Sequence, residues 1–275
     1  MKLRHILITV LLAVLVPVAA AAEGAVPQRI VSVTPSVTEN LFALGVGDRV
    51  VGVTSWCTYP PEAAERAVIG DAFNLNLEVL LSLNPDLVIG DGTMVAAHIQ
   101  QLEALGITVA TINPTTLNEV IESMATLGEL VGEPEAGRAL AAQMRNRLRE
   151  LTARVPVGSS KRVFVELWYE PLMTAGPGSF LHELITLAGG ENIAADTGQP
   201  WPQFSEELVL ARDPEIVILT NYNREEALQR PAWQGLSAYK AGAVFEVNPD
   251  LYVRGTPRLL DGLAELISLI HGVEL

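Results

Sequence analysis

The fold of this chain is decided by the stretch Asn76-Leu77-Glu78-Val79-Leu80-Leu81-Ser82-Leu83-Asn84-Pro85-Asp86-Leu87-Val88-Ile89, because the second half repeats it as Ser205-Glu206-Glu207-Leu208-Val209-Leu210-Ala211-Arg212-Asp213-Pro214-Glu215-Ile216-Val217-Ile218. In both copies a short apolar helix leads through a proline into a run typical of a buried strand. A second echo lies upstream, where residues 36–45 match residues 179–189 with one residue more before the glycine. The repeat predicts two similar α/β lobes that face each other, and a cleft between lobes is a place where ligands bind.

Strands alternate with helices around that stretch. Short apolar or β-branched runs predict strands at residues 29–33, 50–53, 86–89, 108–112 and 162–167, and helical patterns lie at 36–44, 78–83 and 95–105. We expect Ser36 and Glu39 to form a capping box at the start of the first helix. This alternation predicts an α/β fold with mainly parallel sheets.

A different pattern joins the two lobes. Thr116 and Glu119 form a second predicted capping box, for a helix that runs to about Val131, and apolar residues at helical spacing continue a further helix from Pro134 to about Arg154. Because a helix of about 20 residues spans ~30 Å, it can cross from one lobe to the other. The sequence predicts an N-terminal lobe of residues 23–132, a single long interlobe helix within 133–157 and a C-terminal lobe of residues 158–275. The alternative is that this helix packs on the first lobe only.

The first residues predict export. Lys2, Arg4 and His5 precede an apolar run from Ile6 to Val16 and an alanine-rich stretch, which is typical of a signal peptide of residues 1–22. The alternative is an uncleaved anchor, but the run falls short of the ~18 apolar residues of a span. No cysteine follows the run, so we expect no lipid anchor and a soluble periplasmic protein after cleavage.

Charge and cysteine content exclude several classes of function. The net charge of −14 argues against binding to nucleic acid or anionic lipid. Cys57 is the only cysteine in the chain, which excludes an intrachain disulfide. His98, His182 and His271 stand singly, so no metal site is expected. No nucleotide-binding or nucleophile motif is present, and we expect no catalytic residues.

The residues resemble those of a known family, the substrate-binding proteins of ABC importers for vitamin B12, haem and iron siderophores, whose lobes are bridged by one long helix. The segments that carry the resemblance are Arg29 to Gly52, Tyr59-Pro60-Pro61, Asn76-Leu77-Glu78, Asn84-Pro85-Asp86-Leu87-Val88, Gly189-Gly190-Glu191-Asn192-Ile193, Trp201-Pro202-Gln203 and Pro257-Arg258. Within the family the chain is most similar to the vitamin B12 (cobalamin) binding members. The resemblance implies a monomer that captures a metal macrocycle, delivers it to the permease dimer of a membrane importer, and holds no cofactor of its own.

Glu78 and Glu207 are the predicted transporter-docking residues. Each lies in the first turn of a helix, where a carboxylate also complements the helix dipole, and that structural role is the alternative. One acidic residue on each lobe would match a permease dimer with one basic socket per subunit, and the resemblance implies the same role. Exposed ion pairs of this kind contribute about 0–1 kcal/mol each.

Aromatic side chains gather in the loops that follow predicted strands. The predicted ligand-binding residues are Trp56, Tyr59, Phe73, Trp168, Tyr169, Trp201, Asp250, Tyr252 and Arg254. Flat aromatic surfaces suit a planar macrocycle. The resemblance implies that Trp56 and Tyr59 face the ring, and that Asp250 and Arg254 contact its edge. Trp56, Cys57, Thr58 and Leu251 depart from the residues of the vitamin B12 binders.

Three alternatives remain open. Arg254 and Arg258 would also suit the carboxylates of haem or of a ferric siderophore, although Arg258 can equally be a helix-start residue. The Cys57 thiolate could coordinate a bound metal. A secreted enzyme could use acidic residues such as Asp71 and Asp91.

Overall fold

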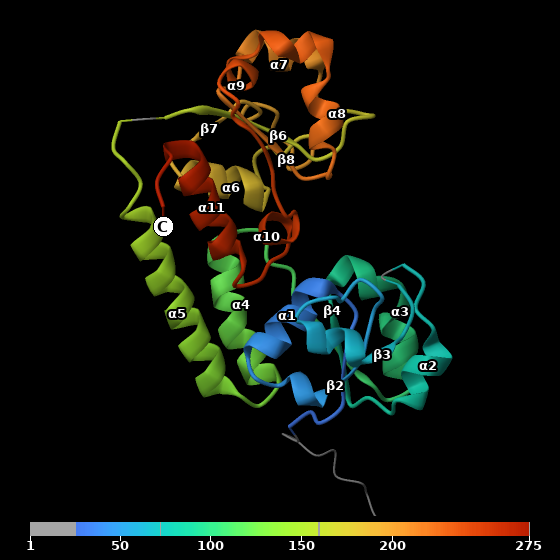
Figure 1. Ribbon diagram of the computed structural model, residues 1–275. Coiled ribbons are helices and arrows are strands. Elements are labelled where there is room, and N and C mark those ends of the chain that lie inside the picture. Colours follow the sequence, from blue (N-terminus) through green and yellow to red (C-terminus); the bar gives the residue numbers. More distant parts are fainter. Residues whose placement is uncertain (1–25, 72, 159, 275) are drawn as a thin grey trace, which may run out of the picture.

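The computed structural model describes residues 26–71, 73–158 and 160–274, so the predicted signal peptide lies outside the described residues. Figure 1 shows two lobes with a pair of helices running along one side of both. Each lobe is a parallel sheet covered by helices. This arrangement confirms the predicted α/β fold with two similar lobes.

The N-terminal lobe contains a five-stranded sheet among the described residues. All of its strand pairs are parallel. In spatial order the strands are β3 (Ala67–Val68), β2 (Val50–Val53), β1 (Ile30–Ser32), β4 (Leu87–Gly90) and β5 (Thr108–Thr111). The helices of this lobe are α1 (Pro35–Ala43), α2 (Leu77–Ser82) and α3 (Gly92–Ala104), with the short 3-10 helices η1 (Gly47–Arg49) and η2 (Pro61–Glu65).

The C-terminal lobe repeats this design with four described strands, all paired in parallel. In spatial order they are β7 (Glu191–Asn192), β6 (Arg162–Glu166), β8 (Ile216–Leu219) and β9 (Val244–Glu246). Its helices are α6 (Phe180–Leu187), α7 (Glu206–Arg212), α8 (Arg224–Leu228), α9 (Ser237–Lys240), α10 (Asp250–Val253) and α11 (Leu259–His271), with η3 (Pro231–Gly235).

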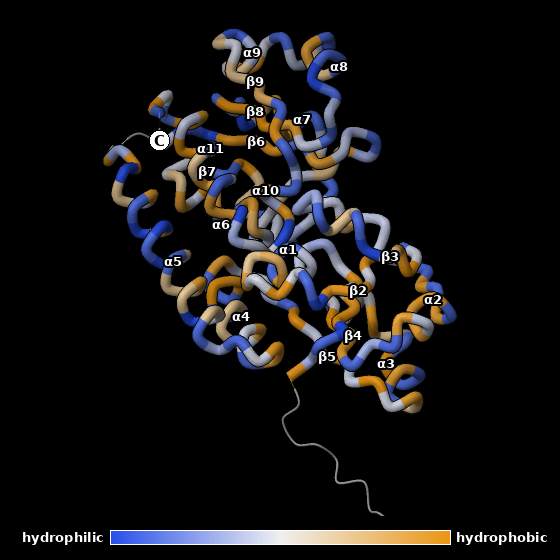
Figure 2. The backbone as a smooth tube through the Cα atoms, turned by 60° about the horizontal axis from the view of Figure 1, so that its bottom comes forward, coloured by the Kyte–Doolittle hydropathy of each residue, from blue (hydrophilic) through white to orange (hydrophobic). Residues whose placement is uncertain are grey.

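Central strands such as β4 and β8 are buried on both faces, which explains why they are apolar without interruption. In the first lobe Ile30 belongs to the hydrophobic core on one face, and its neighbour Val31 belongs to the core on the other. In the second lobe Val163 and Phe164 divide in the same way. Figure 2 shows β6 and β8 as apolar segments.

The repeated stretch folds alike in both lobes, as α2 followed by β4 and as α7 followed by β8. Asn76 and Ser205 cap the two helices through their side chains, which accept hydrogen bonds from the backbone N–H groups three residues on. Asn84 and Asp213, each just before the proline, adopt left-handed backbone angles with φ of 45° and 42°. Asn and Asp tolerate this region better than other non-glycine residues, so the sequence chemistry of the repeat matches its turn.

Helix α5 (Pro134–Thr152) carries the chain from one lobe to the other, and α4 (Leu117–Leu130) packs along it. Ala136 near its start packs on the N-terminal core, whereas Leu151 near its end belongs to the C-terminal core. Helix α4 makes the same crossing in reverse, because Leu117 belongs to the C-terminal core and Leu127 to the N-terminal core. Helix α5 is therefore the predicted interlobe helix, and α4 packs against it in the antiparallel direction.

Glycines allow this helix pair to approach closely. A Cβ atom at Gly137 of α5 would lie 2.5 Å from the carbonyl oxygen of Met124, and one at Gly128 of α4 would lie 2.8 Å from the Cα atom of Gly137. A side chain at either position would push the helices apart. The close approach of α4 and α5 therefore depends on glycine at both positions.

The two predicted capping boxes have different outcomes. Thr116 and Glu119 form the predicted box at the start of α4, which confirms that prediction. The predicted box of Ser36 and Glu39 is wrong, because α1 begins at Pro35 after Thr34, whose side chain makes no capping hydrogen bond. The carboxylate of Glu39 turns instead toward arginines of the other lobe.

Candidate ligand cleft and docking surface

The carboxyl ends of the two parallel sheets face each other. A cavity of about 110 Å³ between them is lined by Asp91 and Pro114, which follow strands of the first lobe, and by Phe180, Val253 and Gly255 of the second. Ligands of open α/β sheets bind outside the carboxyl ends of the strands. This cavity therefore marks the floor of the candidate cleft.

Aromatic side chains stand exposed in the loops of the N-terminal wall. Trp56 follows β2 and is 44% exposed, and Phe73 after β3 is 67% exposed. Their rings meet edge to face with centroids 5.4 Å apart. Tyr59 is also largely exposed, and the guanidinium group of Arg258 lies 3.9 Å from the centre of its ring.

The loop that presents Phe73 is organised by Asp71. Its carboxylate accepts hydrogen bonds from the backbone N–H groups of Phe73 and Asn74, each at 2.8 Å. These bonds hold the pKa of Asp71 below its ordinary value. Asp71 is thus occupied as a loop support, which argues against its use as a catalytic acid or base.

The C-terminal wall presents Trp168 and Trp201, which are 59% and 43% exposed. Isolated β-bridges join Trp168 to Met173 and Met173 to Gln203, so the two tryptophan loops lie side by side. The indole N–H of Trp168 donates to the carbonyl oxygen of Glu170 at 3.0 Å, which fixes the loop. A pocket of about 430 Å³ beside Trp168 is also lined by Asn221 and Asn223.

A buried ion pair supports this wall from behind. Glu166, at the end of β6, is fully buried and bonded to the guanidinium group of Arg230, which is also buried. The side-chain amides of Asn221 and Asn223 donate to the same carboxylate at 2.9 and 3.0 Å. Sequence reasoning missed these four residues, because nothing in the chain places Arg230 opposite Glu166. Their signal was a polar run directly after an apolar strand.

The side chain of Tyr169 is held by contacts within the C-terminal lobe. Its hydroxyl donates to Glu206 at 2.9 Å, and Arg230 stacks 3.5 Å from the centre of its ring. Burial raises the pKa of the Tyr169 hydroxyl, and the hydrogen bond to Glu206 raises it further. These contacts hold Tyr169 in place, and it lines the same pocket as Trp168.

The structure does not retain Tyr252 as a ligand-binding residue. The side chain of Tyr252 is fully buried in the core of the C-terminal lobe, and its hydroxyl donates to Glu265 at 2.5 Å. Burial and this bond raise its pKa far above the ordinary range. The prediction was wrong because a tyrosine in a short helix before α11 can turn toward either the cleft or the core.

Asp250 and Arg254, predicted to contact the edge of the ligand, bind each other, and a further partner lies across the lobes. Arg254 binds Asp250 at 2.8 Å and Glu39 of α1 at 2.7 Å. Arg258 binds the second oxygen of Glu39 at 3.2 Å. Asn40 adds a hydrogen bond at 3.0 Å to the carbonyl oxygen of Gly255. These contacts join α1 to the segment before α11.

The thiol of Cys57 is out of reach of a ligand in the cleft. Cys57 is 2% exposed and belongs to the N-terminal core, with its sulfur 3.2 Å from the hydroxyl oxygen of Thr54. The hypothesis that it coordinates a bound metal is therefore not supported. Across the described ranges, no group of three or more His, Cys, Asp or Glu side chains is placed to hold a metal ion.

Glu78 and Glu207, the predicted docking residues, are both exposed in the first turns of α2 and α7. The backbone N–H of Glu207 and the hydroxyl of Ser205 lower the pKa of Glu207. Its neighbour Glu206 instead accepts hydrogen bonds from Tyr169 and Trp233 inside the lobe. An exposed carboxylate thus stands at each of the two equivalent positions.

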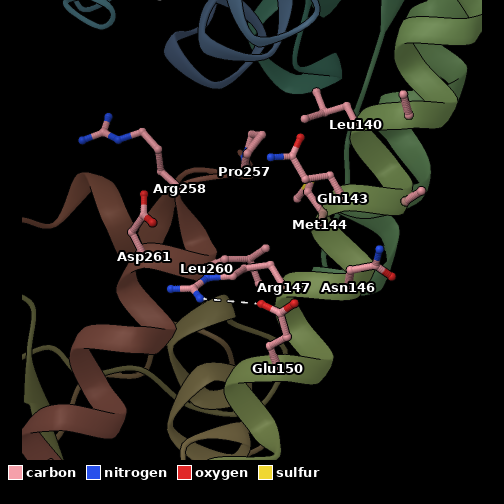
Figure 3. Close-up of a pocket in the computed structure, with 12 residues that line it drawn as sticks. Leu140, Gln143, Met144, Asn146, Arg147, Glu150, Pro257, Arg258, Leu260 and Asp261 are labelled. Atoms are coloured by element: carbon pink, nitrogen blue, oxygen red, sulfur yellow. Dashed lines mark ion pairs between the residues drawn. The ribbon is translucent and has the colours of Figure 1, made fainter. Parts of the chain in front are cut away.

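A second hollow lies apart from the aromatic walls. Figure 3 shows a groove between α5 and the start of α11, with Leu140, Met144 and Leu260 pointing into it and Arg147 paired with Glu150. Its volume is about 740 Å³. None of the predicted ligand-binding residues lines it.

Comparisons with known proteins agree with this architecture. The family described as periplasmic binding protein matches residues 30–251. An uncharacterized ABC transporter substrate-binding lipoprotein, YvrC of Bacillus subtilis, is 36% identical over 89% of this chain and 80% of its own. The crystal structure of the periplasmic vitamin B12 binding protein BtuF of Vibrio cholerae matches with a TM-score of 0.79 at 32% identity, over 89% of this chain and 97% of that one. The periplasmic heme-binding protein RhuT of Roseiflexus sp. RS-1 matches with a TM-score of 0.77 at 30% identity, over 89% and 98%. Among the described helices, none has the length and apolar character of a membrane span.

Proposed function

The chain belongs to the periplasmic binding protein family, and from this premise we propose that it captures a corrinoid, cobalamin, between its lobes and delivers it to an ABC importer. The family is a class of substrate-binding proteins, so its members bind a small molecule and pass it to a membrane permease. We propose that this chain catalyses no reaction.

The observation that carries the proposal is the set of exposed aromatic side chains on both walls. Trp56 and Phe73 stand on one wall, and Trp168 and Trp201 on the other. Large aromatic side chains are costly to leave in water, and an exposed apolar surface rimmed by polar groups marks a binding site. Flat rings on opposing walls suit a flat macrocycle whose two faces are largely apolar.

The arginines of the cleft favour a ligand without carboxylates. Arg254 and Arg258 both bind Glu39, and Arg230 binds Glu166. Arginine forks recognise the carboxylates of haem or siderophores when they are free to do so. Cobalamin carries amide side chains on its ring instead. The pairing of these three arginines therefore supports a corrinoid over an anionic iron complex.

The rest of the proposed transport role concerns docking to the permease and export by the predicted signal peptide. We propose that the exposed carboxylates of Glu78 and Glu207 each meet a basic residue of one permease subunit. Exposed charge pairs set orientation and association rate more than affinity. Residues 1–22 would direct the chain to the periplasm and be removed, leaving a soluble protein that acts as a monomer.

Haem is the second candidate ligand, because one feature of the N-terminal wall favours it. Tyr59 is 43% exposed. A tyrosine oxygen is one of the protein ligands of ferric haem iron. The similarity to a heme-binding protein at 30% identity supports the same alternative.

Isothermal titration calorimetry of the mature protein separates these candidates. The protein is titrated with cyanocobalamin, and haem and a ferric siderophore are then tested as competitors. We expect binding of cyanocobalamin at one per chain, undisturbed by the two iron complexes. Binding of haem in the absence of cobalamin binding would replace the ligand and keep the transport role, and Tyr59→Phe would then abolish the absorption band of tyrosine-bound ferric haem.

A further inference from the structure

A four-residue network of charged side chains links the lobes at the floor of the cleft. We name it the hinge network, and it consists of Glu39, Asp250, Arg254 and Arg258. Glu39 is its centre, with a side chain only 2% exposed. One carboxylate oxygen lies 2.7 Å from Arg254 and the other 3.2 Å from Arg258. Glu39 comes from the N-terminal lobe, whereas the other three belong to the C-terminal lobe.

The hinge network carries no net charge, since two carboxylates balance two guanidinium groups. A buried carboxylate is costly unless cations pair with it, so Glu39 draws both arginines toward itself. Arg254 is held further by Asp250, and the flat face of Arg258 is held against the ring of Tyr59. Both arginines are thereby kept in fixed positions with their charge compensated.

The hinge network lies where a ligand would sense its charge. Val253 and Gly255, on either side of Arg254, line the cavity at the cleft floor. Arg258 and Tyr59 line a pocket of about 590 Å³ together with Glu39, and Arg258 also lines the groove between α5 and α11. Figure 3 shows Arg258 extending from the start of α11 toward the first lobe. With Glu39 neutral, the same place would carry one unit of positive charge.

We propose that Glu39 is a specificity-determining residue, which cancels the charge of Arg254 and Arg258 and so makes the cleft discriminate against macrocycles that bear carboxylates. This inference rests on the proposed function, in which the ligand is a corrinoid whose ring side chains are uncharged amides. Glu39 need not touch the ligand, because it acts through the two arginines that it positions. Removing its charge should make anionic ligands bind more tightly while neutral ligands change little.

A purely mechanical role for Glu39 is the competing explanation, and the structure provides a matched control. Asn40, the next residue of α1, joins the same two segments through its bond to the carbonyl oxygen of Gly255. Asn40→Ala removes an interlobe contact without changing any charge. If Glu39 only fastened the lobes, Glu39→Gln and Asn40→Ala would alter the binding of all ligands alike.

The test compares two ligands that differ at one side chain, which is an amide in one and a carboxylate in the other. Cyanocobalamin and its monocarboxylic acid, in which one side-chain amide is hydrolysed, are titrated calorimetrically into the wild type, Glu39→Gln and Asn40→Ala. We expect Glu39→Gln to raise the preference for the acid about tenfold, as one unit charge at a partly exposed site would, and added salt to reduce this gain. Asn40→Ala should leave the preference unchanged.

The opposite variant makes the test independent of how well Glu39→Gln folds. Arg258→Met leaves the hinge network with an excess negative charge, so it should lower the preference for the acid. A preference that stays within twofold of wild type in both charge variants would overturn the proposal, as would an equal shift in Asn40→Ala. If the wild type binds no corrinoid, the proposed choice of ligand is refuted but the role of Glu39 is not. Haem and its uncharged dimethyl ester would then serve as the ligand pair for the same test.

Discussion

Replacing Trp168 by alanine should weaken corrinoid binding by one to two orders of magnitude while leaving the fold intact. Trp168 is 59% exposed and takes no part in either hydrophobic core of its lobe. Its indole is held in place by the hydrogen bond to the carbonyl oxygen of Glu170. The side chain is thus positioned for a partner that is not part of the chain.

The size of the loss can be worked from that exposure. A tryptophan offers at most about 250 Å² of surface, so about 150 Å² of Trp168 remains in water and a flat ligand would cover about 75 Å². At about 25 cal/mol per Å², removing this contact costs about 2 kcal/mol. That corresponds to a roughly 25-fold rise in Kd.

Calorimetric titration with cyanocobalamin measures this loss, and thermal unfolding measures the fold. Trp168→Phe should keep much of the affinity, because the smaller ring still presents a flat face. Val157→Ala, at a fully exposed position between α5 and β6, should change nothing. A Kd of Trp168→Ala within twofold of wild type, at an unchanged unfolding temperature, would refute the assignment of this loop to the cleft wall.

Three further predictions concern stability and delivery. Arg230→Met leaves Glu166 buried without its cation, so the free energy of unfolding in urea should fall by about 3–5 kcal/mol, and an unchanged urea midpoint would show that the pair does not support the lobe. Glu78→Ala and Glu207→Ala should each weaken association with the permease by up to about 1 kcal/mol without altering ligand affinity. A pull-down measures the association and a calorimetric titration measures the ligand affinity. A change in ligand affinity alone would argue against a docking role. Ser237 donates a hydrogen bond to Asp213 and holds the folded-state pKa of Asp213 below the ordinary 3.8. This bond therefore stabilises the fold above pH 3.8 and ceases to do so as the pH falls through the folded pKa. Urea unfolding of Ser237→Ala and wild type should show a difference in stability at neutral pH that vanishes in acid, and a difference that is constant with pH would contradict this prediction.

Periodicity and the internal repeat were sufficient to predict the fold. Apolar runs such as residues 86–89 have few alternatives to a buried strand, and the observed strand differs from the prediction by one residue at either end. Thr116 with Glu119 predicted the start of α4 correctly, because both halves of a capping box are local in sequence. Local chemistry of this kind is readable without knowing what lies across the molecule.

The candidate site could be predicted only in part, because some of its contacts join residues that are far apart in the sequence. Trp56 and Trp168 are exposed in loops, as the sequence predicted, whereas Tyr252 is buried in the core. The partners of Glu39 and Glu166 lie 215 and 64 residues away, at Arg254 and Arg230, so no local pattern pairs them. Glu39 in particular satisfied the spacing of a capping box, and its attraction to two arginines prevailed over that local interaction.

The most direct test of the account is a crystal structure of the mature protein grown with cyanocobalamin. We expect one corrinoid between the lobes, with its faces against the loops of Trp56 and Phe73 on one side and of Trp168 and Trp201 on the other. We also expect that Arg254 and Arg258 still bind Glu39. A corrinoid seated in the groove between α5 and α11, or on the surface of a single lobe, would contradict this expectation.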